Sequence, residues 1–285
     1  MAEATSGHAT PEELSALGAV RASMRAEAAA EVKELVARVE DVNADGVPAR
    51  LYVPHDARAA MLYLHGGGFA LGDLVSHDGI GRRLAARTGW AVLMPDYRRS
   101  PEHAWPAADE DSATAAEWLS GEDFDQLAVV GDSAGAALAL GEALRSPGRY
   151  AAQVLVYPFL DPSCATYDAE LDVTDLSMAQ AEMFWRLYLQ GADATTDPAL
   201  GVLERDDPDD LAALADLPAT LVQLAELDVL TAAGRLLVDR LQAAGVPTEA
   251  EEYPGVQHGF WRKTDNRQSE PALTAVAAFL ARLDR

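Results

Sequence analysis

The sequence predicts an α/β fold with a mostly parallel central sheet and helices on both faces. Five short apolar runs recur along the chain, and such runs are typical of strands buried on both faces. Segments with helical spacing of apolar residues separate these runs, and this alternation produces right-handed crossovers between parallel strands. With 285 residues, 49% of them hydrophobic, the chain has enough core for one large α/β domain or two small ones.

The first expected elements are a helix and a hairpin. Thr10 is a candidate N-cap, with Pro11 at the first helical position and Glu13 closing a capping box. The helix could continue to residue 36. Residues 37–54 then read as two strands around the turn Asn-Ala-Asp-Gly.

The body of the chain is expected to alternate strand and helix. The apolar runs cover residues 59–65, 90–97, 127–131, 152–158 and 219–226. The helical patterns cover residues 76–88, 106–119, 135–144 and 231–245. A last strand should precede His258, and a final helix carries one apolar face made of Leu273, Val276, Ala277, Leu280 and Leu283.

Residues 161–218 interrupt the alternation, because they contain no convincing strand. Residues 175–190 are apolar around most of a helical circumference, so this helix should be buried on two sides. We interpret the segment as an insertion that lies over the body.

Composition excludes several classes of function. The formal net charge is −24, and such a surface repels nucleic-acid phosphates and anionic lipid. The chain has no apolar run of membrane-spanning length and no segment typical of a signal peptide. Cys164 is the single cysteine, so no intrachain disulfide can form, and we expect a cytoplasmic protein.

Ser133 lies in Gly131-Asp132-Ser133-Ala134-Gly135, between an expected strand and an expected helix. Strand, Gly-x-Ser-x-Gly and helix together form a nucleophile elbow, in which a sharp turn presents the serine hydroxyl. The serine would stand at the carboxyl end of a parallel strand, where open α/β sheets bind ligands. The sequence therefore predicts that Ser133 is a nucleophile.

A serine nucleophile needs a base, and in this fold an acid and then a histidine follow it in the chain. His258 is the one histidine after Ser133, so it is the candidate base. Taken alone, it would more simply be interpreted as a loop histidine that forms a structural hydrogen bond. Glu226 and Asp228 both follow the preceding expected strand, and their spacing does not choose between them.

An oxyanion needs hydrogen-bond donors. The amide of Ala134 follows the nucleophile, and the run Gly66-Gly67-Gly68 after an earlier strand could supply others. A flexible loop or a phosphate cradle would be alternatives for this run, but it has neither a Gly-Lys-Ser/Thr ending nor Rossmann spacing.

Taken together, these motifs resemble the hormone-sensitive-lipase-like, or bacterial family IV, carboxylesterases of the α/β-hydrolase superfamily. The resemblance spans roughly residues 40–285 and includes His-Gly-Gly-Gly at 65–68, the motif at 96–108, Gly-Asp-Ser-Ala-Gly at 131–135, and His-Gly-Phe at 258–260. It implies an α/β-hydrolase fold with a helical cap, in which residues 1–38 form an N-terminal cap segment. Residues 39–285 would form the catalytic domain, with a cap insertion at about 163–200.

The resemblance also implies residue roles: Ser133 as nucleophile, His258 as base, Asp228 as acid, and the amides of Gly66, Gly67 and Ala134 as oxyanion donors. The expected reaction is hydrolysis of small esters with short- or medium-chain acyl groups, by a monomer or homodimer that needs no metal or cofactor. Amide or lactone hydrolysis and a non-catalytic receptor are the alternatives. The expected substrate-binding residues are aromatic: Phe69, Phe184, Trp185 and Tyr188.

Overall fold

The computed structural model describes residues 7–171, 175–193, 197, 199–203 and 212–283. Its centre is an eight-stranded sheet in the order β1-β2-β4-β3-β5-β6-β7-β8. The strand β2 is antiparallel to β1 and to β4, and all other neighbours are parallel. The prediction of a mostly parallel sheet is therefore confirmed.

The expected strands form with small shifts at their ends. Their bounds are β1 (Arg38–Ala44), β2 (Val47–Val53), β3 (Ala59–Leu64), β4 (Ala91–Pro95), β5 (Gln126–Asp132), β6 (Ala152–Val156), β7 (Ala219–Leu227) and β8 (Thr248–Gln257). Every residue of β3, β4 and β6 is buried, as expected for strands covered on both faces.

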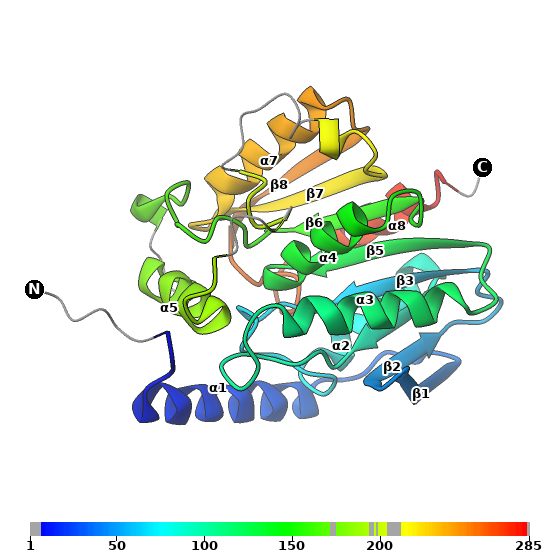
Figure 1. The fold of residues 1–285 in the computed structure, drawn as a ribbon. Coiled ribbons are helices and arrows are strands. Elements are labelled where there is room, and N and C mark those ends of the chain that lie inside the picture. Colours follow the sequence, from blue (N-terminus) through cyan, green and yellow to red (C-terminus); the bar gives the residue numbers. More distant parts are fainter. Residues whose placement is uncertain (1–6, 172–174, 194–196, 198, 204–211, 284–285) are drawn as a thin grey trace, which may run out of the picture.

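Two layers of helices sandwich the sheet (Figure 1). One face packs against α3 (Ala107–Ser120), α4 (Ala134–Arg145) and α7 (Thr231–Ala243), and the other against α2 (Asp78–Thr88) and α8 (Ser269–Leu280). In the final helix Leu273, Val276 and Leu280 are buried, which confirms most of the predicted apolar face.

The first helix, α1 (Pro11–Ala30), begins with the predicted capping box. Its predicted continuation to residue 36 is wrong, because Glu31 is extended (φ −69°, ψ 142°). The residues beyond Glu31 are held against α2 instead, where Arg87 donates to both carboxylate oxygens of Glu34 at 2.5 and 2.6 Å. Tertiary contacts thus override the local helical propensity.

The interrupting segment contains a short 3₁₀ turn, η1 (Ala169–Leu171), and the helix α5 (Met178–Leu189). Among the described residues of 161–218 no strand is present, as predicted. Helix α5 buries Ala181, Phe184, Trp185, Leu187 and Tyr188. Parts of both proposed cap segments (1–38 and 163–200) lie outside the described residues, and the cap division remains a prediction.

Candidate active site

Ser133 stands at the turn between β5 and α4. Its backbone has a positive φ (φ 55°, ψ −122°), a conformation that costs a non-glycine residue roughly 1–3 kcal/mol. A Cβ atom at Gly131 would collide with the Gly135 carbonyl, and one at Gly135 with the carbonyl of Leu64. Both flanking positions therefore have no room for a side chain, and the elbow holds the serine at the start of α4.

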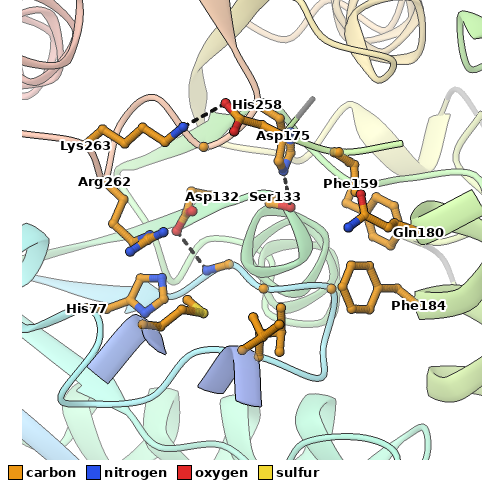
Figure 2. A pocket seen from close by; sticks show the side chains of 18 of the residues that line it. His77, Asp132, Ser133, Phe159, Asp175, Gln180, Phe184, His258, Arg262 and Lys263 are labelled. Carbon is orange, nitrogen blue, oxygen red and sulfur yellow. Dashed lines mark hydrogen bonds and ion pairs between the residues drawn. The ribbon is translucent and has the colours of Figure 1, made fainter. Parts of the chain in front are cut away.

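Ser133, His258 and Asp228 form one hydrogen-bonded chain. The Oγ of Ser133 lies 2.9 Å from His258 Nε2, and His258 Nδ1 lies 2.7 Å from Asp228 Oδ2 (Figure 2 draws the first of these bonds). Asp228 is buried, and its other oxygen accepts the Leu230 amide at 3.1 Å. The three predicted residues follow or end β5, β7 and β8, and the fold brings them together.

Glu226, the other carboxylate considered, faces elsewhere. It is exposed and accepts the Gly255 amide of β8 at 2.6 Å. The pairing of β7 with β8 is irregular between Ala225 and Leu227, so the side chains of residues 226 and 228 do not follow simple strand alternation.

The prediction of Gly66 as an oxyanion donor is wrong, because its amide already donates to Asp132 Oδ1 at 2.9 Å. The amides of Gly67 and Gly68 have no hydrogen-bond acceptor among the described residues, and both glycines line the pocket beside Ser133. The amide of Ala134 is the first of α4, where helical N–H groups have no partner within the helix. The candidate donors are therefore Gly67, Gly68 and Ala134.

A buried polar cluster around Asp132 holds the first glycine of this loop, Gly66. Asp132 accepts the Tyr63 hydroxyl at 2.7 Å and the more distant Tyr157 hydroxyl at 3.4 Å. Burial raises the pKa of the Asp132 carboxyl, while the bonds from Tyr63 and Gly66 oppose that shift. Burial also holds the pKa of both tyrosines well above its usual value, so both remain hydrogen-bond donors.

Two stacked histidines lie beside the loop. The ring of His65 stacks between those of His77 and Tyr97, with centroids 4.8 and 4.3 Å away. Burial lowers the pKa of His65 to about 4 and holds that of His77 well below its usual value. Both imidazoles are consequently neutral near neutral pH.

A cavity of about 370 Å³ opens over Ser133. Helix α1 contributes Val20, Ser23, Met24 and Glu27 to its wall, and α5 contributes Gln180 and Phe184. Its apolar wall near the serine includes Phe159, which the sequence analysis missed. The position of Phe159 just beyond the carboxyl end of β6 was the available signal.

Of the four aromatic residues expected to bind substrate, Phe184 alone lines this cavity. Phe69, Trp185 and Tyr188 are at most 2% exposed, and the expectation for them is wrong. The Phe69 ring stacks on Tyr188 at 3.7 Å and lies 5.3 Å from that of Trp185, so these side chains anchor α5 to the body.

Comparison with known proteins assigns the chain to a protein family. A family model described as "alpha/beta hydrolase fold" matches residues 61–262. Esterase LipI of Mycobacterium tuberculosis is 34% identical over 244 residues, which is 78% of this chain and 75% of that protein. The chain belongs to the hormone-sensitive-lipase-like carboxylesterases of the α/β-hydrolase family.

Other relatives agree with this assignment. An ethyl acetate hydrolase of Pseudomonas putida shares 35% identity with this α/β hydrolase over 76% of the chain and 72% of its own length. The solved structure of a hyperthermophilic esterase from Pyrobaculum calidifontis superimposes with a TM-score of 0.83 and 33% identity, covering 92% of each chain. EstE1, a carboxylesterase cloned from a metagenomic library, gives a TM-score of 0.84 at 32% identity and covers 96% of this chain and 98% of its own.

The described residues of this α/β hydrolase contain neither a metal-binding cluster nor a membrane-spanning helix. No cluster of three or more His, Cys, Asp or Glu side chains there could hold a metal ion. None of the helices within the same ranges combines the length and apolar character of a membrane span.

Proposed function

We propose that the protein hydrolyses esters of short- and medium-chain acids, with Ser133 as the nucleophile, His258 as the base and Asp228 as the orienting acid. The observation that carries this proposal is the hydrogen-bonded chain from Ser133 Oγ to His258 Nε2 (2.9 Å) and from His258 Nδ1 to Asp228 (2.7 Å). A serine hydroxyl becomes an effective nucleophile when such a base accepts its proton.

In the acylation step, Ser133 Oγ attacks the ester carbonyl carbon while its proton moves to His258 Nε2. The negative charge that develops on the carbonyl oxygen is stabilised by the amides of Gly67, Gly68 and Ala134 and by the amino end of α4. The carbon–oxygen bond to the alcohol then breaks, and His258 returns the proton to the leaving alkoxide. Asp228 holds the imidazole in the required tautomer throughout.

In the deacylation step, water attacks the carbonyl carbon of the acyl-serine. His258 removes a proton from the water and returns it to Ser133 Oγ when the acid leaves. Every proton transfer thus uses groups of this chain, substrate and water.

The small volume of the cavity supports the proposed limit on the length of the acyl chain. Its volume of about 370 Å³ lies near the lower end of ordinary small-molecule sites. A cap made from residues 1–38 and about 163–200 would roof it, because α1 and α5 already contribute to its wall. We further propose a cytoplasmic monomer or homodimer, which the net charge of −24 and the unpaired, buried Cys164 suit.

The decisive experiment compares wild type with Ser133→Ala on 4-nitrophenyl esters of two to sixteen carbons. We expect the variant to lose at least about 10⁴-fold in kcat/KM. Wild type should favour acyl groups of roughly two to eight carbons, because the cavity is small. Ser120→Ala, which removes an exposed hydroxyl at the end of α3, is the matched control.

Two results would contradict the proposal. Substantial turnover by purified Ser133→Ala would remove Ser133 as the nucleophile, and faster hydrolysis of the sixteen-carbon than of the four-carbon ester would refute the length limit. A 4-nitroanilide of the preferred acid measures amide hydrolysis beside ester hydrolysis, and it should react more slowly than the ester.

A further inference from the structure

The cavity over Ser133 has two chemically different sides. Phe159 and Phe184 lie on one side of the serine, whereas Arg262, Lys263 and His77 lie on the other (Figure 2). An ester bound at Ser133 extends its acyl group and its alcohol group in different directions. One half of a substrate would therefore meet aromatic rings, and the other half would meet polar side chains, of which Arg262 and Lys263 are cationic.

The two cations differ in how well they are paired. Lys263 Nζ donates to Asp175 Oδ2 at 2.8 Å, so its charge has a close partner. The guanidinium of Arg262 has one ion pair, to Glu27 at 3.9 Å, and no side-chain hydrogen bond among the described residues. The Arg262 side chain is 26% exposed, whereas its partner Glu27 is 61% exposed and reaches in from α1.

The other polar groups on this side leave the guanidinium available. Asp132 lines the same cavity but forms no hydrogen bond or ion pair with Arg262: its Oδ1 accepts the Tyr63 hydroxyl at 2.7 Å and the Gly66 amide at 2.9 Å, and its Oδ2 accepts the Tyr157 hydroxyl at 3.4 Å. His77 is buried, and its lowered pKa keeps it neutral, so it neither pairs with the guanidinium nor adds charge to this side. An arginine with five donors in a half-buried wall is a ready ligand for a carboxylate.

The backbone that carries Arg262 is well anchored. Its amide donates to the Gly259 carbonyl at 3.2 Å, just after His258. Arg83 donates to the carbonyl of Trp261 at 2.8 Å, and the Trp261 side chain is fully buried. The backbone of Arg262 is thus fixed relative to His258. This favours specific recognition, because less conformational freedom is lost when the substrate binds.

We propose that Arg262 is a specificity residue that binds a carboxylate on the substrate, so that the preferred esters carry a free acid group on one half and a small apolar group on the other. This inference rests on the proposed function and names its substrate class. Lys263 adds a second, partly neutralised positive charge at the same wall. The carboxylates Glu27, Asp132 and Asp175 line the same cavity, so a substrate anion would be held by direct charge-assisted hydrogen bonds to the guanidinium and not by a net positive field.

The test pairs charged with neutral esters of similar size. Mono-4-nitrophenyl glutarate and 4-nitrophenyl pentanoate place or omit the carboxylate on the acyl half. Sodium 4-acetoxybenzoate and methyl 4-acetoxybenzoate do the same on the alcohol half. For each pair the measured quantity is the ratio of kcat/KM for the charged ester to that for the neutral ester.

We expect Arg262→Gln to lower this ratio about 10- to 100-fold for at least one pair, mainly through KM, because a charge-assisted hydrogen bond is removed. Arg262→Lys should restore part of the ratio. The pair that responds identifies which half of the substrate carries the acid. Glutarate or benzoate should also inhibit hydrolysis of the neutral ester competitively, with a Ki raised by Arg262→Gln.

The control is Arg58→Gln, which removes an exposed arginine (82% exposed) before β3, at the opposite end of the strand from the glycine loop. If Arg262→Gln leaves the ratios of both pairs unchanged, or slows charged and neutral esters equally, Arg262 acts as a counter-charge for Asp132 and the proposal is overturned. Absence of any Ser133-dependent turnover of the neutral esters would instead contradict the proposed function, so the two failures are distinguishable.

Discussion

Asp228 and Glu226 stand two residues apart at the end of β7, yet the structure gives them different partners. In a regular strand both side chains would point to the same side. The irregular pairing between Ala225 and Leu227 breaks that rule, so Asp228 turns to His258 while Glu226 holds the Gly255 amide. The sequence could name both candidates, but spacing alone could not choose, because a β-bulge leaves no clear mark in the pattern of residues.

Exchanging each carboxylate for its amide tests this difference. We expect Asp228→Asn to lose about 10⁴-fold in kcat, since an asparagine no longer holds the imidazole in the required tautomer. Glu226→Gln should lose roughly tenfold or less, because its contact supports only the neighbouring strand. Both variants would be assayed at neutral pH with one ester, and greater damage in Glu226→Gln would reverse the assignment of the acid.

His65 makes the stability of the protein depend on pH. Burial lowers its pKa from 6.5 to about 4, so the folded state resists a proton that the unfolded state accepts. This contribution is fully present above pH 6.5 and is lost as the pH falls toward 4, by about 3 kcal/mol at most.

The comparison of wild type with His65→Phe isolates this contribution, because phenylalanine keeps a stacking ring and does not titrate. Urea unfolding between pH 7 and pH 4.5 should show a smaller loss of stability in the variant than in wild type. The acid sensitivity of the carboxylates is common to both proteins and cancels in the difference. His55→Phe, at an exposed position, should track wild type, and an equal loss in His65→Phe would show that His65 does not contribute.

At the scale of elements, α1 is attached to the body mainly by polar contacts. Its buried apolar side chains are Leu17 and Ala28. Arg21 donates to the carbonyls of Ala70 and Ser100 at 2.8 and 3.0 Å and forms an ion pair with Glu102. The sequence predicted where this helix begins, but neither its end nor its contribution to the cavity, since both depend on partners distant in the chain.

We therefore expect Arg21→Gln to loosen α1 without unfolding the sheet. Hydrogen exchange across residues 11–30 should become faster, while exchange in β3 and β5 stays slow, because the hydrogen-bond partners of Arg21 lie in loops outside these strands. Arg38→Gln, which removes an exposed ion pair on β1, serves as the control. Equal protection of α1 in wild type and Arg21→Gln would show that other contacts suffice to hold the helix.

The helix α5 shows a second limit at this scale. Its apolar character predicted burial on two sides; the buried residues, Ala181, Phe184, Trp185, Leu187 and Tyr188, instead form one broad face, and Glu182 on the other side is exposed. Neighbouring positions on a helix are turned by about 100° from one another, so Phe184 reaches the cavity while Trp185 packs against Phe69. Composition could not set the rotation of the helix about its axis, because the packing of the body against it decides which side faces the substrate.

At the scale of the whole molecule, the architecture was predictable because strand and helix alternate with different periods. The order of Ser133, Asp228 and His258 in the chain was equally readable, since the fold dictates it. The individual hydrogen bonds of the site could not be predicted in this way. Gly66, for example, is adjacent to the proposed donors, but its amide donates to Asp132. Such choices depend on atoms brought together by β3 and β5, because Tyr63 and Gly66 stand 69 and 66 residues before Asp132 in the chain.

The position of β8 at one edge of the sheet, and last among the strands in chain order, has a consequence for biosynthesis. A growing polypeptide can fold from its amino-terminal side while the remainder is still being translated. Ser133 and the glycine loop could thus take shape on the ribosome long before His258 is synthesised. During that interval the serine lacks its base, so a partly made chain would be unable to cleave esters, and hydrolytic activity would appear only once the last strand has joined the sheet.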